Sequence, residues 1–243
     1  MKTLFAFVKK ELLETVRTGR LFILLAAFLL LGAMNPAIAK LTPWMMELMS
    51  DALASSGMSI TISTVSAVDS WTQFFKNLPI GLIVFLAFAS SAFPREYQSG
   101  TLITALTRGL ARWKVLAAKT AVQMLFWTAC YWLCYGVTAG VNACLWSGQS
   151  IPLTPILHWY LAGLWLIAVL VLWSVILRST IGVLLGTGSV YLVCCLLSFF
   201  PALTAYLPTT LMGGGDWRTV LLTGVTGLLA LAAAVPIFRK KQL

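Results

Sequence analysis

Few residues of this sequence could do chemistry. The chain of 243 residues has one histidine, His158, and seven acidic residues. Cys130 and Cys134 are four residues apart and would share one face of a helix, a spacing that could hold a ligand. The cysteines all lie in or beside apolar runs, so we interpret them as packing residues rather than as a metal, redox or disulfide site. They are Cys130, Cys134, Cys144, Cys194 and Cys195.

These residue types argue against an enzyme. A membrane metalloprotease needs an HExxH motif, a serine protease of the rhomboid type needs a serine and histidine pair, and an aspartyl protease needs two aspartates within its spans. The sequence has a single histidine, no HExxH motif and no aspartate within a predicted span, so we expect none of these sites. The sequence has no Gly-Lys pair and therefore no phosphate-binding loop of the GxxxxGK[ST] type. We expect no catalytic residue and no cofactor in this chain, so any nucleotide-driven motor would be a separate subunit.

The composition predicts an all-α integral membrane protein. Hydrophobic residues make up 60% of the chain and charged residues 10%, and the mean hydropathy is +0.92. Continuous apolar runs of this length fit membrane-spanning helices, whereas strands of a membrane barrel would alternate apolar and polar residues. We predict a single domain over 1–243 with six spans at 21–39, 77–94, 119–146, 157–177, 179–200 and 217–238.

Residues 1–20 are predicted to form an amphipathic helix in the membrane interface. Phe5, Val8, Leu12 and Val16 would form one apolar stripe. The next run ends in Ala37-Ile38-Ala39 and could alternatively be a signal peptide. The long leader contains two glutamates, so we favour a membrane span.

Basic residues predict the orientation. With a cytoplasmic N-terminus, fourteen of the seventeen lysines and arginines fall on the inner side, and Lys40, Lys76 and Arg218 remain outside. Both termini are then cytoplasmic, and we expect a multi-pass protein of the plasma membrane. The net charge of +10 is explained by this topology, so no nucleic-acid partner is expected. All seven acids lie outside the centres of the spans, which argues against an ion-coupled carrier.

Residues 95–118 form a basic loop between the second and third spans. Ser99 or Thr101 could cap a short helix containing Leu102 and Leu106, and Gly109 could end it. Glu96 lies at its start, where a helix dipole favours negative charge. The loop could simply satisfy the positive-inside rule, but that rule does not require an apolar, capped helix between the charges.

This loop resembles that of the ABC-2 type permeases, the membrane subunits of ATP-binding-cassette exporters. The matching residues are Glu96, Gly100-Thr101-Leu102, Arg108 to Arg112, and Ala118-Lys119. Gly109 stands where that family usually has proline, and Ala118 where it usually has glycine. The Lys10-Glu11 pair, the six spans and the basic C-terminal end extend the resemblance along the chain.

The resemblance implies a coupling helix that docks into an ATPase subunit, with two permeases and two ATPases in the complex. ATP and magnesium would be bound by that partner. The docking role falls on Glu96, Gly100, Thr101, Leu102, Leu106, Arg108 and Arg112. Gly182 and Gly186 form a Gly-x-x-x-Gly face, which would serve either packing within the chain or a homodimer contact; the resemblance favours the dimer.

The expected function is export of hydrophobic or amphipathic cargo, with a membrane-active peptide such as an antimicrobial or toxin peptide as the first choice. A drug or lipid exporter would have the same features. A membrane immunity or sensor subunit could use the same loop to hold an ATPase without transport. A stand-alone channel or carrier is a third class, which conduction without any ATPase would indicate.

Overall fold

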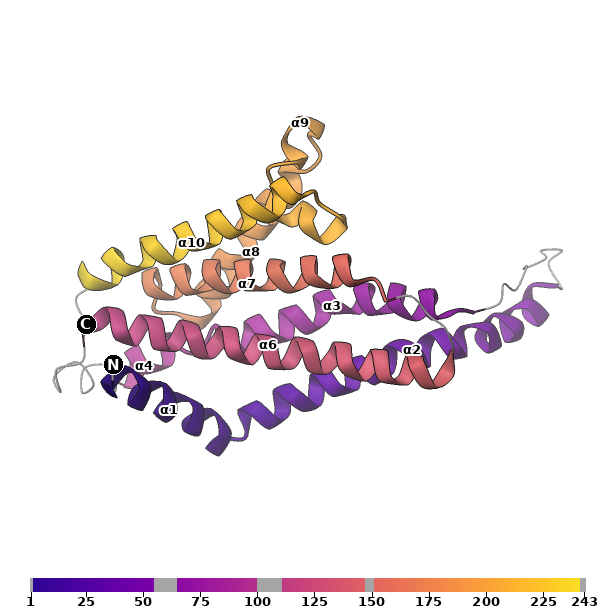
Figure 1. Cartoon of the computed structure of the whole chain (residues 1–243), viewed down its shortest axis with the longest axis horizontal. Helices are drawn as coiled ribbons and strands as arrows, with labels where there is room; N and C mark the ends of the chain where they lie inside the picture. The colour runs from indigo at the N-terminus through magenta and orange to yellow at the C-terminus, as the bar shows by residue number, and fades with distance from the viewer. Residues whose placement is uncertain (1, 55–64, 100–110, 147–150, 241–243) are drawn as a thin grey trace. The chain divides into compact units, whose positions relative to one another are not determined.

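The structure is a computed structural model that describes residues 2–54, 65–99, 111–146 and 151–240. In these ranges every regular element is a helix, so the predicted all-helical fold is confirmed (Figure 1). The helices are α1 Lys2–Arg17, α2 Arg20–Ala54, α3 Ala67–Ala89, α4 Pro94–Ser99, α6 Arg112–Leu145, α7 Leu153–Ile176, α8 Thr180–Leu197, α9 Pro201–Thr204, η1 Pro208–Gly213 and α10 Trp217–Lys240.

Six of these helices are long and apolar enough to cross a membrane, as predicted. They are α2, α3, α6, α7, α8 and α10. Several extend beyond the apolar runs that predicted them. The first continues through Pro36 and Pro43 to Ala54, and the third begins at Arg112 rather than at residue 119. Hydrogen bonding along a helix does not stop where apolar residues stop, which explains the extra turns.

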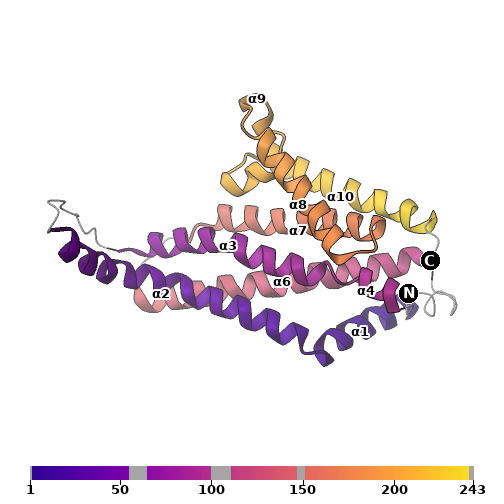
Figure 2. The ribbon, with the colours of Figure 1, turned by 180° about the vertical axis from the view of Figure 1, so that it is seen from behind.

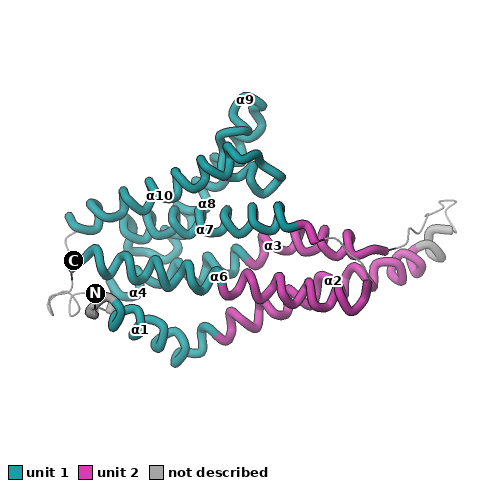
Figure 3. The backbone as a smooth tube through the Cα atoms, in the orientation of Figure 1, with its two compact units in different colours: residues 1–21, 82–128, 153–243 teal, residues 22–81, 129–152 magenta. Residues whose placement is uncertain are grey.

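The chain divides into two compact units, coloured separately in Figure 3. Unit 1 contains residues 1–21, 82–128 and 153–243, and unit 2 contains residues 22–81 and 129–152. Helix α3 therefore contributes residues 82–89 and helix α6 residues 112–128 to unit 1, and the remaining residues of both helices belong to unit 2.

The core of unit 1 is formed around α7. This helix packs against α8, α10 and η1, and Figures 1 and 2 both show it beside α8 and α10. Its buried residues occur on all sides, including Trp165, Ile167 and Leu170. A helix that is apolar all round is expected to lie inside a bundle. Gly163 lets α7 approach Trp127, whose indole Nε1 donates a hydrogen bond to the Tyr160 carbonyl at 3.2 Å.

Unit 2 is held together by a small buried amide and hydroxyl network. Asn77 donates to the Asn35 side chain at 2.8 Å, and Asn35 donates to the Thr138 hydroxyl at 3.3 Å. Thr138 in turn donates to the Gly32 carbonyl at 2.9 Å. These bonds join α2, α3 and α6 within an apolar environment where unsatisfied polar groups are costly.

Candidate functional site: a buried ion-pair cluster beside a polar cavity

The candidate site lies in unit 1, where α1 meets the end of α3, α4 and the start of α6. Helix α1 ends at Arg17, and Gly19 follows with a φ of 71°. This left-handed conformation suits glycine and lets the chain turn into α2 at Arg20. Because α1 and α2 are separate helices, α1 can present Glu11 and Glu14 to the other elements of the site.

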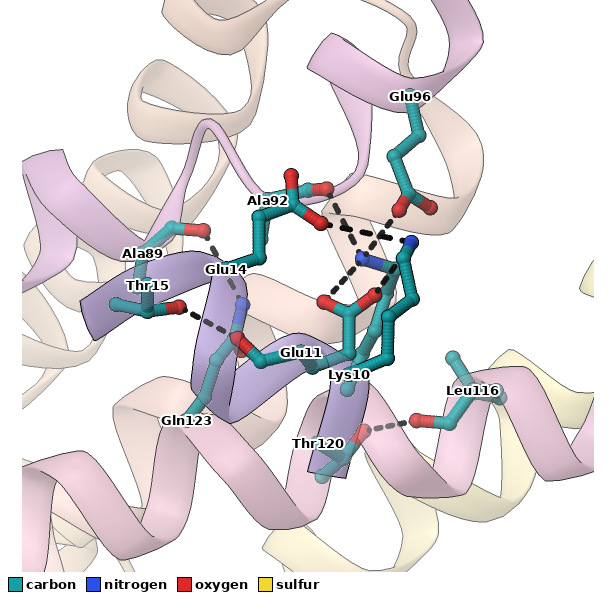
Figure 4. Close-up of polar contacts among 11 residues, drawn as sticks. Lys10, Glu11, Glu14, Thr15, Ala89, Ala92, Glu96, Leu116, Thr120 and Gln123 are labelled. Atoms are coloured by element: carbon teal, nitrogen blue, oxygen red, sulfur yellow. Dashed lines mark hydrogen bonds and ion pairs between the residues drawn. The ribbon is translucent and has the colours of Figure 1, made fainter. Parts of the chain in front are cut away.

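Lys119 is the centre of the site, and Figure 4 labels the two glutamates that it pairs with, Glu11 and Glu96. Its ammonium lies 2.9 Å from Glu11 Oε2 and 3.1 Å from Glu96 Oε1. It also lies 3.5 Å from the Ala92 carbonyl and 5.5 Å from the centre of the Phe93 ring. The side chain of Lys119 is only 3% exposed. One buried cation thus joins α1 and α4 to α6.

A second lysine completes the charge balance. Lys10 Nζ lies 3.7 Å from Glu11 Oε1 and 3.4 Å from Glu14 Oε2, with its side chain half exposed. Partial burial lowers the pKa of Lys10, but the nearby carboxylates of Glu11, Glu14 and Glu96 together outweigh that effect and raise the pKa above its ordinary value. Lys10 therefore stays charged throughout the physiological pH range.

A polar cavity of about 310 Å³ lies beside this cluster. Its walls come from α1, the first residue of α2, the end of α3, α4 and α6. Gln123, which is 5% exposed, donates from Nε2 to the Ala89 carbonyl at 3.2 Å (Figure 4). The lining residues are Glu11, Glu14, Thr15, Thr18, Arg20, Phe88, Ala89, Ser91, Ala92, Arg95, Glu96, Lys119, Val122, Gln123 and Phe126.

The start of α6 is also fixed to the end of α10. Arg112 Nη1 donates to the carbonyls of Phe238 at 3.3 Å and Arg239 at 2.9 Å. The rings of Phe93 and Phe238 pack edge to face, with their centres 6.2 Å apart. The last carbonyls of a helix have no partner in the helix, so a guanidinium is well suited to this position.

Two of the predicted docking residues can be placed. Glu96 lies in α4 with its carboxylate against Lys119, and Arg112 lies at the first residue of α6 against the end of α10. Both side chains thus have contacts within the chain. The other predicted docking residues, Gly100, Thr101, Leu102, Leu106 and Arg108, lie outside the described residues.

The predicted glycine face on α8 packs within the chain at Gly186. A Cβ atom built on Gly186 would lie 2.6 Å from Trp173 Cδ2 of α7, so no side chain fits there without a shift. A Cβ atom on Gly182 would lie 3.3 Å from Cδ1 of Leu177, which is a closer approach than most side chains make. Gly186 therefore allows α7 and α8 to pack closely.

The central role of Lys119 and Glu11 was missed as a site by sequence reasoning, although both residues belong to the family resemblance. Two sequence signals could have indicated them: a lysine at the start of an apolar run, and three acids, Glu11, Glu14 and Glu96, in otherwise basic inner segments. A charge in a span usually has an opposite charge nearby. What the sequence did not show is which acids, 108 and 23 residues away, provide the pairing.

This arrangement fixes several helices to one another through one buried ammonium group. The Lys119 ammonium contacts two carboxylates and a carbonyl. Charge-assisted hydrogen bonds of this kind are short and directional. They fix α4 to α1 and α6, directly before residue 100.

Comparison with known proteins gives one family. No curated protein matches the sequence. A family model described as "Protein of unknown function (DUF2705)" matches residues 37–200, which is more than half of the chain. The matched range includes Glu96, Lys119 and most of the cavity, while Glu11 precedes it. The chain is therefore a member of the DUF2705 family.

Proposed function

We propose that this protein is the membrane-spanning subunit of an ATP-binding-cassette exporter. In this proposal two copies pair with two separate ATPase subunits, which bind ATP and magnesium. The termini face the cytoplasm of the cell, α1 lies in the inner membrane interface, and residues 95–118 carry the coupling helix. The resemblance of that loop and the six apolar helices support the proposal.

The observation that carries the proposal is the attachment of α4 to Lys119. The segment that would contact the ATPase begins directly after α4 and ends where α6 begins. Glu96 fixes its beginning to α6 and α1, and Arg112 fixes its end to α10. Motion imposed on residues 100–111 by a closing ATPase would therefore reach α1, α6 and α10 through short polar contacts.

The cargo we propose is hydrophobic or amphipathic, with a membrane-active peptide as the first choice. Charged residues line the cavity beside Lys119 and a second cavity, which includes Asp69 and Lys76. The spans themselves are predominantly apolar. An apolar route suits a cargo that partitions into lipid better than a hydrated ion.

The test begins with an ATPase partner. The tagged protein would be purified from its native membrane and exposed to a photoreactive ATP analogue, which should label a separate, co-purifying chain. In vesicles containing both chains, the transported peptide should accelerate ATP hydrolysis. Leu106→Asp should abolish co-purification, because it places a charge on the apolar face of the predicted coupling helix.

Leu153→Asp is the matched control, since Leu153 is an exposed leucine at the start of α7. This variant should keep its ATPase. Absence of an ATP-binding chain from the purified complex would contradict the proposal. Retention of the ATPase without any peptide transport would instead favour the immunity or sensor alternative.

A further inference from the structure

The cavity beside Lys119 contains buried acceptor atoms that receive no hydrogen bond from the described residues. Gln123 Oε1 is buried and accepts no hydrogen bond from the described residues. The orientation of this amide is fixed, because its Nε2 donates to the Ala89 carbonyl, which can only accept. Glu11 Oε1 is likewise buried without a hydrogen-bond donor, since the Lys10 ammonium lies 3.7 Å away, at ion-pair but not hydrogen-bond distance. Two acceptors therefore lie in the cavity wall with no donor.

The same cavity is lined by two arginines that lack a carboxylate partner. No acidic side chain in the described ranges lies within ion-pair distance of Arg20 or Arg95. A guanidinium group binds phosphate with paired, charge-assisted hydrogen bonds. A ligand that satisfied all four groups would carry a phosphate and an N–H donor.

The place of the cavity in the chain points to the source of such a ligand. Arg20 is the first residue of one candidate span and Arg95 lies two residues before the end of the next, while Gln123 is the twelfth residue of the third, which begins at Arg112. The ends of the first two spans lie at the depth of lipid headgroups. Phe88, Val122 and Phe126 give the cavity an apolar wall, against which an acyl chain could leave.

We infer that this cavity binds the headgroup of a phospholipid with a primary ammonium group, such as phosphatidylethanolamine. The phosphate contacts Arg20 and Arg95, and the ammonium donates to Gln123 Oε1 and Glu11 Oε1. The volume of about 310 Å³ falls within the range of roughly 300–1,000 Å³ that small-molecule pockets occupy. This ligand would connect α1, α4 and α6 around the ion pairs.

Two common phospholipids differ in whether their headgroup carries an N–H donor. Phosphatidylcholine has the same phosphate but no N–H donor, so it can satisfy the arginines and leave both acceptors unpaired. The protein, freed of lipid in detergent, would be mixed with equal amounts of the two lipids with identical acyl chains. Retained lipid would be counted by native mass spectrometry. We expect a preference of at least about tenfold for phosphatidylethanolamine, because only its ammonium donates hydrogen bonds to the two acceptors.

Two variants test the two parts of the site. Gln123→Met keeps the side-chain length but removes the acceptor, so the preference should fall while phosphatidylcholine retention stays unchanged. The double variant Arg20→Gln with Arg95→Gln should retain less of both lipids. Arg218→Gln is the matched control, because Arg218 is exposed at the start of α10 and does not line the cavity.

Equal retention of the two lipids by the unaltered protein would overturn the inference, as would an unchanged preference in Gln123→Met. Free phosphoethanolamine, added at the same concentration, should compete poorly because it lacks the acyl chains. Competition as strong as that of the lipid would overturn the lipid source. None of these measurements involves an ATPase, so the result is independent of the proposed export function.

Discussion

Lys119 is held by contacts that are expensive to break singly. Removing one member of a buried ion pair typically costs about 3–5 kcal/mol, because the remaining charge stays buried without compensation. Here the removal of one ammonium would leave two carboxylates, Glu11 and Glu96, whose side chains are 14% and 13% exposed. The attachment of α1 and α4 to α6 therefore depends on the single ammonium group of Lys119.

We predict that Lys119→Met lowers the stability of the protein by about 3–5 kcal/mol. The reason is repulsion and desolvation at the two remaining carboxylates. Thermal unfolding in detergent would measure the loss. Lys76→Met is the control, since Lys76 is an exposed lysine of unit 2. This variant should unfold at almost the same temperature as the unaltered protein.

A triple variant separates charge from packing. Glu11→Gln, Glu96→Gln and Lys119→Met together leave no buried charge in the cluster, so most of the lost stability should return. If the triple variant is as unstable as Lys119→Met alone, the loss comes from the packing of the lysine stem rather than from uncompensated charge, and our account of the cluster is wrong.

At the scale of elements, the end of α10 depends on another helix. Phe238 and Arg239 are among the last residues of α10, and Arg112 of α6 donates to both of their carbonyls. Removing this contact should loosen the last turn without unfolding the bundle.

We predict that Arg112→Met increases amide hydrogen exchange in the last turn of α10 by roughly tenfold, since a charged hydrogen bond contributes about 1.5–3 kcal/mol. Lys114→Met removes a neighbouring basic side chain of α6 and should leave this exchange unchanged. Equal protection in the two variants would show that α10 ends independently of Arg112.

The packing of α8 on α7 leads to another prediction. Gly186→Ala should destabilise the protein by about 1–3 kcal/mol, because the new methyl group would meet the Trp173 ring. Gly188→Ala, two residues along the same helix, meets nothing within 4 Å and should be neutral or slightly stabilising. Unfolding in detergent compares them. Similar stability in both variants would refute close packing at Gly186.

The sequence predicted the existence of the six apolar helices well and their lengths less well. Long apolar runs identify spans because they are continuous and local. The extra turns of α2 and α3 contain residues such as Lys40 and Asp69, which a hydropathy window excludes although the helix continues through them. The pairing of Lys119 with Glu11 depends on tertiary packing over 108 residues, which no local pattern encodes.

At the scale of the whole molecule, six spans have a consequence for topology. An even number of crossings places both termini on the same side of the membrane. Single cysteines introduced at Lys9 and Lys240 of a cysteine-free variant should therefore react alike with a membrane-impermeant maleimide, and a cysteine at Ile151 should react from the opposite side. Opposite labelling at Lys9 and Lys240 would mean that one candidate span does not cross.

The ion-pair cluster also imposes an order on biosynthesis. Translation produces Glu11 and Glu96 before Lys119. The two carboxylates therefore lack their common counterion until the third span has left the ribosome. A nascent chain that ends before residue 119 lacks the ion pair between Glu11 and Lys119 that attaches α1 to α6. A chain that ends after α6 contains both residues and can form this ion pair. The segments around the first two spans would then complete their ion pairs only after the third span has been inserted.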